Sequence, residues 1–191
     1  MKNNFKLYFI VFMCICSTIS VNAQSRISSV FGVNLGDSEQ IVTSKISGKW
    51  KTSKGERFYV TTNPTLGNCT FEAATFKFRS NKLCKVVFYS SQGALCDTNF
   101  QCADGAPNGY ELFLENAQKY KKIFKRMYFD LLDKYGVPIL NDEERALWKS
   151  NGNTLEIEYD YKDTTNEYGW HDTWVRVAVT YKTTESTSSN Y

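Results

Sequence analysis

Apolar residues recur at steps of three and four through the middle of the chain, and this pattern predicts one long amphipathic helix. Asn108 and Glu111 form a start signal, and Gly136 followed by Pro138 forms a stop signal. The apolar stripe consists of Phe113, Ala117, Tyr120, Phe124, Met127, Leu131 and Tyr135. We expect this stripe to be buried against a sheet.

A shorter helix is predicted near the start of the chain. Asp37 can cap its first turn, Gln40 follows three residues later, and Gly48 is the expected stop. The apolar face of this helix would consist of Ile41, Val42 and Ile46.

Alternating or β-rich runs predict the strands of the fold, at 58–62, 70–79, 82–89, 146–149, 154–161 and 173–182. Ser80-Asn81 and Asn151-Gly152 each separate two runs and are typical of two-residue hairpin turns. The segments 90–107 and 162–171 have no clear period and are expected to be loops.

The first hairpin also predicts a register between its two strands. If the strands pair without a bulge, Phe78 faces Leu83, while Lys77 faces Cys84. In the same register Ala74 faces Val87.

The order of these elements indicates an α+β fold. Consecutive hairpins favour an antiparallel sheet, covered on one face by the short N-terminal helix and the long central helix. The elements can be divided into two α-β-β-β units. We expect a single domain over 24–183 and a flexible polar tail over 184–191.

Residues 1–23 have the pattern of a secretory signal peptide. Lys2 and Lys6 flank the start, Leu7–Cys16 is apolar, and Val21-Asn22-Ala23 fits a cleavage site. The run is too short for a transmembrane span. This predicts export to the periplasm or the extracellular space.

The composition of the remaining chain excludes some functions. The formal net charge of +3 falls to +1 when Lys2 and Lys6 are removed, so charge gives no reason to expect nucleic-acid binding. Hydrophobic residues at 42% and aromatic residues at 15% exclude a disordered chain.

The cysteines bear on both processing and cross-linking. Of the six cysteines, Cys14 and Cys16 lie in the predicted signal. A lipid anchor on one of them is the alternative to cleavage after Ala23, and the large residues preceding both favour cleavage. The four that remain are Cys69, Cys84, Cys96 and Cys102.

An even number of cysteines in an exported chain indicates disulfides. The predicted register separates Cys69 from Cys84 too far for a bond and favours Cys69 with Cys96. Cys84 with Cys102 follows by elimination, and a local bond between Cys96 and Cys102 is the main alternative. A zinc site needs clustered cysteine and histidine ligands, but the sequence has no C-x-x-C motif and its single histidine is His171. No metal site or cofactor is therefore predicted.

The segment from Tyr168 to Trp174 concentrates aromatic rings in a predicted loop. Tyr168, Trp170, His171 and Trp174 are the candidate binding residues, because such rings bring large contact area at low entropic cost. The alternative is that the rings fill the core at the sheet edge. His171 and Asp172 resemble a base and its orienting acid, but no nucleophile motif accompanies them, so no catalytic residue is predicted.

Two charged clusters have functional and structural interpretations. Glu156, Glu158 and Asp160 form one strand face, where a cation site or acid–base pair is the alternative to ion pairing with Arg176 and Lys182. Pairing is favoured. The basic stripe on the long helix consists of Lys119, Lys121, Lys122, Lys125 and Arg126. Acidic residues bracket this stripe, which favours a solvated face over an acidic partner.

One stretch resembles a known fold family. Phe31-Gly32-x-x-Leu35-Gly36-x-Ser38-x-x-Ile41 is similar to the opening of helix-then-sheet modules in the β-lactamase inhibitor protein-like fold and in small outer-membrane assembly lipoproteins. Leu131-Leu132-x-Lys134-Tyr135-Gly136-x-Pro138 looks like a second helix exit. The resemblance implies two α-β-β-β units over most of 31–182 and a non-catalytic protein-binding module. The cysteine-bearing segment departs from that pattern, and no family binding residue is carried over.

These observations lead to one expected function and two alternatives. The expectation is an exported, non-catalytic binding or interaction module whose partner is another exported protein or a glycan. The alternatives are a hydrolase that uses strand carboxylates and a structural component of the cell envelope.

Overall fold

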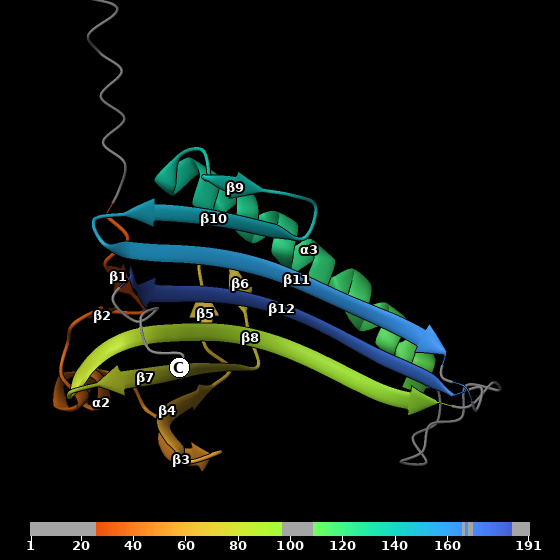
Figure 1. Cartoon of the computed structure of the whole chain (residues 1–191), viewed down its shortest axis with the longest axis horizontal. Coiled ribbons are helices and arrows are strands. Elements are labelled where there is room, and N and C mark those ends of the chain that lie inside the picture. Colours follow the sequence, from red (N-terminus) through yellow and green to blue (C-terminus); the bar gives the residue numbers. More distant parts are fainter. Residues whose placement is uncertain (1–25, 97–108, 166, 168–169, 185–191) are drawn as a thin grey trace, which may run out of the picture.

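The computed structural model describes residues 26–96, 109–165, 167 and 170–184. Within these ranges the chain forms one 8-stranded antiparallel sheet, two 2-stranded sheets and two helices, which confirms the predicted α+β class (Figure 1). The predicted signal and most of the predicted tail lie outside the described residues. No helix within the described ranges is long and apolar enough to cross a membrane.

The large sheet consists of two meanders that meet in its middle. Helix α2 (Glu39–Lys45) precedes the first meander, which contains β3 (Lys49–Ser53), β4 (Glu56–Thr62), β7 (Ala73–Arg79) and β8 (Lys82–Cys96). Helix α3 (Gly109–Tyr135) precedes the second, which contains β9 (Leu140–Asn141), β10 (Arg145–Ser150), β11 (Asn153–Thr165) and β12 (His171–Thr183). The strand order is β3-β4-β7-β8-β12-β11-β10-β9, so each half contributes four strands to the sheet.

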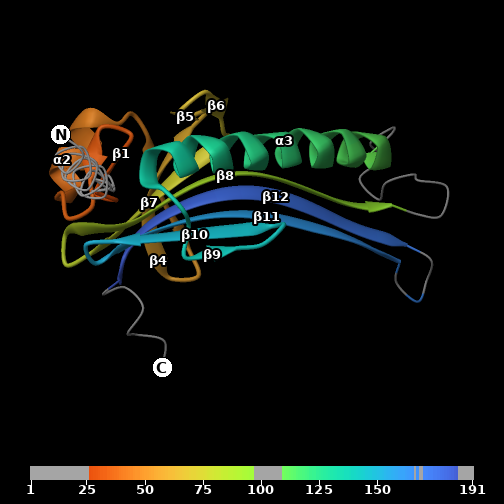
Figure 2. The ribbon, with the colours of Figure 1, turned by 90° about the horizontal axis from the view of Figure 1, so that it is seen from above.

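Two short hairpins lie outside the large sheet. One pairs β1 (Ser29–Val30) with β2 (Val33–Asn34), and the other pairs β5 (Thr65–Leu66) with β6 (Cys69–Thr70). The β5–β6 hairpin interrupts the first meander between β4 and β7, and it stands beside α3 (Figure 2).

Helix α3 packs along one face of the sheet, against β8, β11 and β12 (Figure 2). We call this the inner face and the opposite one the outer face. All seven residues of the predicted stripe, from Phe113 to Tyr135, are buried. Gly136, at φ +76°, donates from its amide to the carbonyl of Leu132 and ends the helix as predicted. The predicted start at Asn108 lies outside the described residues.

The caps of α2 differ from the prediction. The side chain of Ser38, not Asp37, accepts a hydrogen bond from the amide of Ile41 at 3.3 Å. Asp37 instead accepts from the amide of Asn34 at 2.9 Å. The helix ends at Lys45, before Gly48. Gly48 is needed for close packing, because a Cβ there would lie 2.4 Å from the carbonyl oxygen of Val60.

The predicted hairpin turns are present, but the first hairpin contains a β-bulge. Ser80 and Asn81 both have positive φ, as a type I′ turn requires, and Phe78 pairs with Leu83. The register then shifts, so that Lys77 faces Lys85 and not Cys84. The same shift places Ala74 opposite Phe88 and not Val87.

Several strands are longer than predicted, and others were not predicted, among them β3 and β9 of the large sheet. β8 continues to Cys96 through the segment expected to be a loop. β11 and β12 extend toward each other, which shortens the loop predicted over 162–171. β3 has an exposed, lysine-containing sequence without apolar alternation, so periodicity gave no signal for it.

The two predicted disulfides that involve Cys69 and Cys84 are not formed, because both residues carry free thiols in the described part of the chain. The prediction extended the strand over 70–79 straight to Cys69, whereas the chain leaves the sheet there to form the β5–β6 hairpin. Cys69 lies near Arg126, while the backbone of Cys96 pairs with His171 at the other end of α3. Cys84 donates its S–H to the carbonyl of Lys77 at 3.4 Å. Cys102, and with it the alternative Cys96–Cys102 bond, lies outside the described residues.

Candidate functional site

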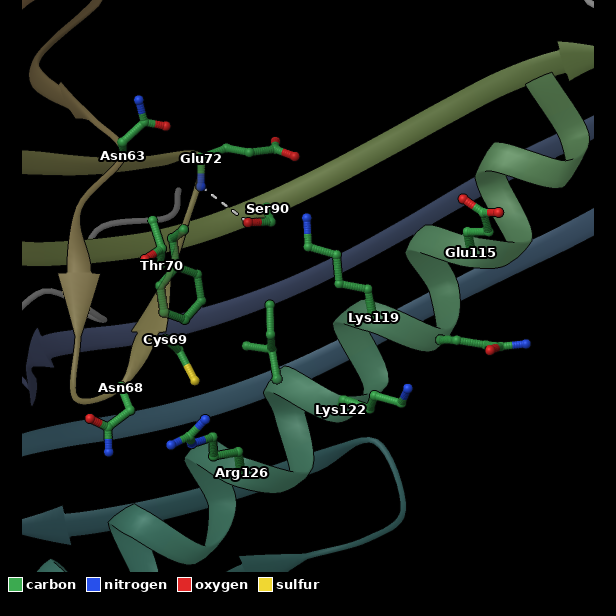
Figure 3. A pocket seen from close by; sticks show the side chains of 13 residues that line it. Asn63, Asn68, Cys69, Thr70, Glu72, Ser90, Glu115, Lys119, Lys122 and Arg126 are labelled. Carbon is green, nitrogen blue, oxygen red and sulfur yellow. Dashed lines mark hydrogen bonds between the residues drawn. The ribbon is translucent and has the colours of Figure 1, made fainter. Parts of the chain in front are cut away.

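A cleft of roughly 630 Å³ lies between the β5–β6 hairpin and α3 (Figure 3). This volume is in the range of small-molecule and peptide side-chain sites. Its hairpin side and the adjoining strands contribute Asn63, Asn68, Cys69, Thr70, Phe71, Glu72 and Ser90. Its helix side contributes Glu115, Gln118, Lys119, Lys122, Ile123 and Arg126.

The root of the hairpin is tied to α3 through Glu72. The hydroxyl of Tyr120 donates to Oε1 of Glu72 at 2.6 Å, and the amide of Ser91 donates to Oε2 at 3.1 Å. The amide of Glu72 donates in turn to Oγ of Ser90 at 3.1 Å. Burial and the bond to Glu72 raise the pKa of Tyr120, so its hydroxyl stays protonated as the donor.

The tip of the hairpin also approaches α3, at Asp130, which follows Tyr120 along the helix. Gly67 has φ +57°, and a Cβ at this position would lie 3.3 Å from Oδ2 of Asp130. The hairpin therefore approaches α3 at both ends of the cleft, through the hydrogen bond of Glu72 to Tyr120 and through the close approach of Gly67 to Asp130.

Three cations on α3 form the charged wall of the cleft. Lys119, Lys122 and Arg126 make no ion pair with any residue that the structure describes. Lys119 extends toward Ser90 and Glu72, and Arg126 extends toward Asn68 and Cys69 (Figure 3). All three are exposed to solvent, and they outnumber the two carboxylates that line the cleft, Glu72 and Glu115, so the cleft can attract a negatively charged ligand.

The facing wall and the floor are uncharged apart from Glu72. Asn63, Asn68 and Thr70 offer hydrogen-bond donors and acceptors, and Phe71 and Cys69 are buried beneath them. Burial raises the pKa of the Cys69 thiol, and the nearby charge of Arg126 opposes this shift only in part. A protonated, buried thiol is a poor nucleophile. The arrangement can bind a ligand but lacks an activated group for covalent chemistry.

Two of the predicted binding residues, His171 and Trp174, lie on opposite faces of the sheet. His171 lies on the inner face, with its ring 5.5 Å from that of Tyr110 and its Nδ1 3.4 Å from Oδ1 of Asp163. Trp174 lies on the outer face, 37% exposed, with the Arg176 guanidinium 5.4 Å from its ring centroid. Trp170 is half-buried just before β12, and Tyr168 lies outside the described residues.

The acidic face of β11 forms ion pairs, as the favoured interpretation expected. Arg176 lies 2.7 Å from Asp160 and 3.4 Å from Glu158, and Lys182 lies 3.8 Å from Glu156. Arg145 pairs with both glutamates as well. Burial and the neighbouring Glu156 raise the pKa of Glu158. Neither glutamate lines the cleft.

No metal site is evident in the described ranges, where no group of three or more His, Cys, Asp or Glu side chains could hold an ion. Comparison with protein-family models, with curated proteins and with solved structures finds no match. The cleft itself must therefore support any functional conclusion.

Sequence reasoning missed the cleft because its walls come from segments far apart in the chain: Glu72 and Tyr120, which join them, are 48 positions apart. The sequence shows the basic stripe of α3, but the helix pattern does not show that Lys119, Lys122 and Arg126 line a cleft while Lys121 and Lys125 do not. The signal that could have located the hairpin was Asn63-Pro64 followed by Gly67, which together interrupt the strand pattern.

Proposed function

We propose that this chain is an exported, non-catalytic binding module and that its cleft holds an acidic segment of another exported protein. The observation that carries the proposal is the wall of Lys119, Lys122 and Arg126, three cations without an ion pair among the described residues. Carboxylates form charge-assisted hydrogen bonds with such groups.

The spacing of the cations favours an extended acidic chain. Lys119 and Arg126 are two helical turns apart, which corresponds to about 10 Å along α3 at about 1.5 Å per residue. Side chains on one face of an extended strand lie about 7 Å apart when they are two residues apart and about 13 Å apart when they are four residues apart, so acidic residues at these spacings bracket the distance between the two cations. The amide and hydroxyl groups of Asn63, Asn68 and Thr70 can bond the backbone of such a segment.

The same proposal includes two related modules and the export that the first residues predict. Each half of the chain presents one helix followed by four strands of the shared sheet, one strand more than the α-β-β-β unit that the resemblance implies, and this repeated order is what supports tandem units. If the chain is secreted to the periplasm or the extracellular space, the proteins that it can bind there are themselves exported.

Charge reversal on adjacent helix positions tests the cleft. Arg126→Glu reverses a charge inside it, and Lys125→Glu reverses one on the exposed side of the same turn. We expect Arg126→Glu to weaken binding of a fluorescent poly-glutamate peptide about tenfold more than Lys125→Glu does, a difference of about 1.4 kcal/mol. Fluorescence anisotropy measures both affinities at one ionic strength.

Equal losses in the two variants would mean that the peptide senses net charge only, and the cleft would not be the site. If the wild-type protein binds an acidic polysaccharide and not the peptide, and Arg126→Glu abolishes this binding, the partner is a glycan and the protein-segment proposal is wrong.

A further inference from the structure

Three lysines stand side by side on the outer face of the sheet. In the register of β7, β8 and β12, Lys77 pairs directly with Lys85, and Lys85 pairs directly with Lys182. Their neighbours Phe76, Val86 and Tyr181 are buried, so the lysines alternate to the opposite face. We call Lys77, Lys85 and Lys182 the lysine row.

This arrangement is electrostatically unfavourable in the protein alone. Directly opposed residues on neighbouring strands have Cβ atoms about 5 Å apart, and like charges in such pairs destabilise a sheet. Lys85 stands between two other lysines and is only partly exposed. Burial, followed by the charges of Lys77 and Lys182, lowers the pKa of Lys85.

The acids nearby form ion pairs with the ends of the row, whereas Glu156 and Glu158 act on the central Lys85 only through their charges, which oppose the lowering of its pKa. Lys77 forms an ion pair with Glu56, and Lys182 lies 3.8 Å from Glu156. Glu156 is held more closely by Arg145, and Glu158 is engaged by Arg176. Lys85 makes no ion pair with a residue that the structure describes, so its ammonium group lacks a direct counter-ion.

A concave surface adjoins the row on the same face. A hollow of roughly 430 Å³ is lined by Ser53, Lys54, Glu56, Phe58, Thr75 and Lys77. It adds Lys54 as a further cation beside the row. A ligand on the row therefore has room to extend toward β3 and β4 without a clash with α3, which lies on the other face.

We propose that the lysine row binds a small, multivalent phosphate-type oxyanion centred on Lys85. Ammonium groups carried by directly paired residues of neighbouring strands can share the oxygens of one such group, which replaces their mutual repulsion with charge-assisted hydrogen bonds. Lysine binds phosphate as a point charge and does not need the fork geometry of arginine. The row lies on the face opposite the cleft and does not rest on the proposed function.

Stability measurements with and without an anion test this site. Without a ligand, Lys85→Gln should raise the urea midpoint relative to wild type, because it removes the repulsion. Inorganic pyrophosphate should raise the wild-type midpoint beyond the effect of sodium chloride at the same ionic strength, and Lys85→Gln should lose that extra shift. Calorimetric titration should show at least tenfold weaker pyrophosphate binding by Lys85→Gln, while Lys125→Gln on α3 keeps the wild-type affinity.

Three results would overturn the site. One is a pyrophosphate shift in wild type no larger than that of sodium chloride; another is an equal loss of affinity in Lys125→Gln. The third is binding to phosphatidylglycerol vesicles without binding to pyrophosphate, which would exclude a small soluble ligand. If Lys85→Gln fails to fold, Lys85→Met, which keeps a long unbranched side chain without the charge, is measured in its place for both the urea midpoint and the pyrophosphate affinity.

Discussion

Phe124 shows how strongly a single side chain can hold α3 on the sheet. It is 6% exposed, and its ring centroid lies 6.4 Å from that of Tyr159. Phe124→Ala is expected to lower the free energy of unfolding by about 3–5 kcal/mol, because it removes a large ring and leaves a cavity. Urea denaturation measures the change.

Phe129→Ala is the matched control for this prediction. Phe129 lies on the same helix but is 63% exposed, so its removal should change the free energy of unfolding by no more than about 0.5 kcal/mol. Similar losses in both variants would contradict the packing of α3 described above.

For single residues, the sequence predicted which side chains of α3 are buried better than it predicted helix caps and disulfide bonds. The stripe from Phe113 to Tyr135 was predicted in full, because a 3.6-residue period reports directly on one helix face. The cap on Ser38 and the free thiol of Cys69 were not predicted, since neighbouring residues can each serve as a cap and a disulfide depends on where the chain turns away from the sheet.

At the scale of elements, the turn between β7 and β8 offers a stabilising substitution. Ser80 and Asn81 have φ values of +49° and +60°, in the left-handed region that asparagine tolerates better than serine. Ser80→Asn should therefore raise the free energy of unfolding by about 0.5–1 kcal/mol. Thermal denaturation measures the change. In the control Ser53→Asn, where φ is not positive, the free energy of unfolding should change by no more than about 0.5 kcal/mol. A destabilised Ser80→Asn would argue against the type I′ turn.

The elements that sequence reasoning missed are those set by tertiary contacts. β8 continues to Cys96 because the long β12 pairs with it from Lys85 to Cys96, although the sequence of β8 shows no strand period after Tyr89. The β5–β6 hairpin, with only two residues in each strand, is stabilised against α3 through Tyr120 and Glu72. The cleft depends on that contact, so no local pattern could have located it.

At the scale of the whole molecule, the sheet separates two kinds of surface. The inner face carries α3 and most of the buried aromatic rings, among them Phe88, Tyr159 and Tyr181. The outer face carries the paired charges of β11 and the lysine row, and its exposed apolar residues include Trp174 and Leu140. Because the proposed cleft and the lysine row lie on opposite sides of the sheet, substitutions at one should leave binding at the other unchanged.

The buried tyrosines of the inner face make the whole fold sensitive to alkaline pH. Burial raises the pKa of Tyr120, Tyr159 and Tyr181 above the ordinary value of about 10. Above pH of about 10 the unfolded chain therefore releases protons that the folded chain retains, and the free energy of unfolding falls as pH rises. Each such tyrosine lowers the free energy of unfolding by up to about 1.4 kcal/mol per pH unit. The lowered pKa of Lys85 has the opposite effect on stability, but it involves a single group.

Urea midpoints measured above pH of about 10 should therefore decline steeply in the wild-type protein and less steeply in Tyr120→Phe and Tyr181→Phe. Identical slopes in all three proteins would show that these hydroxyls ionise in the folded state as they do in the unfolded chain.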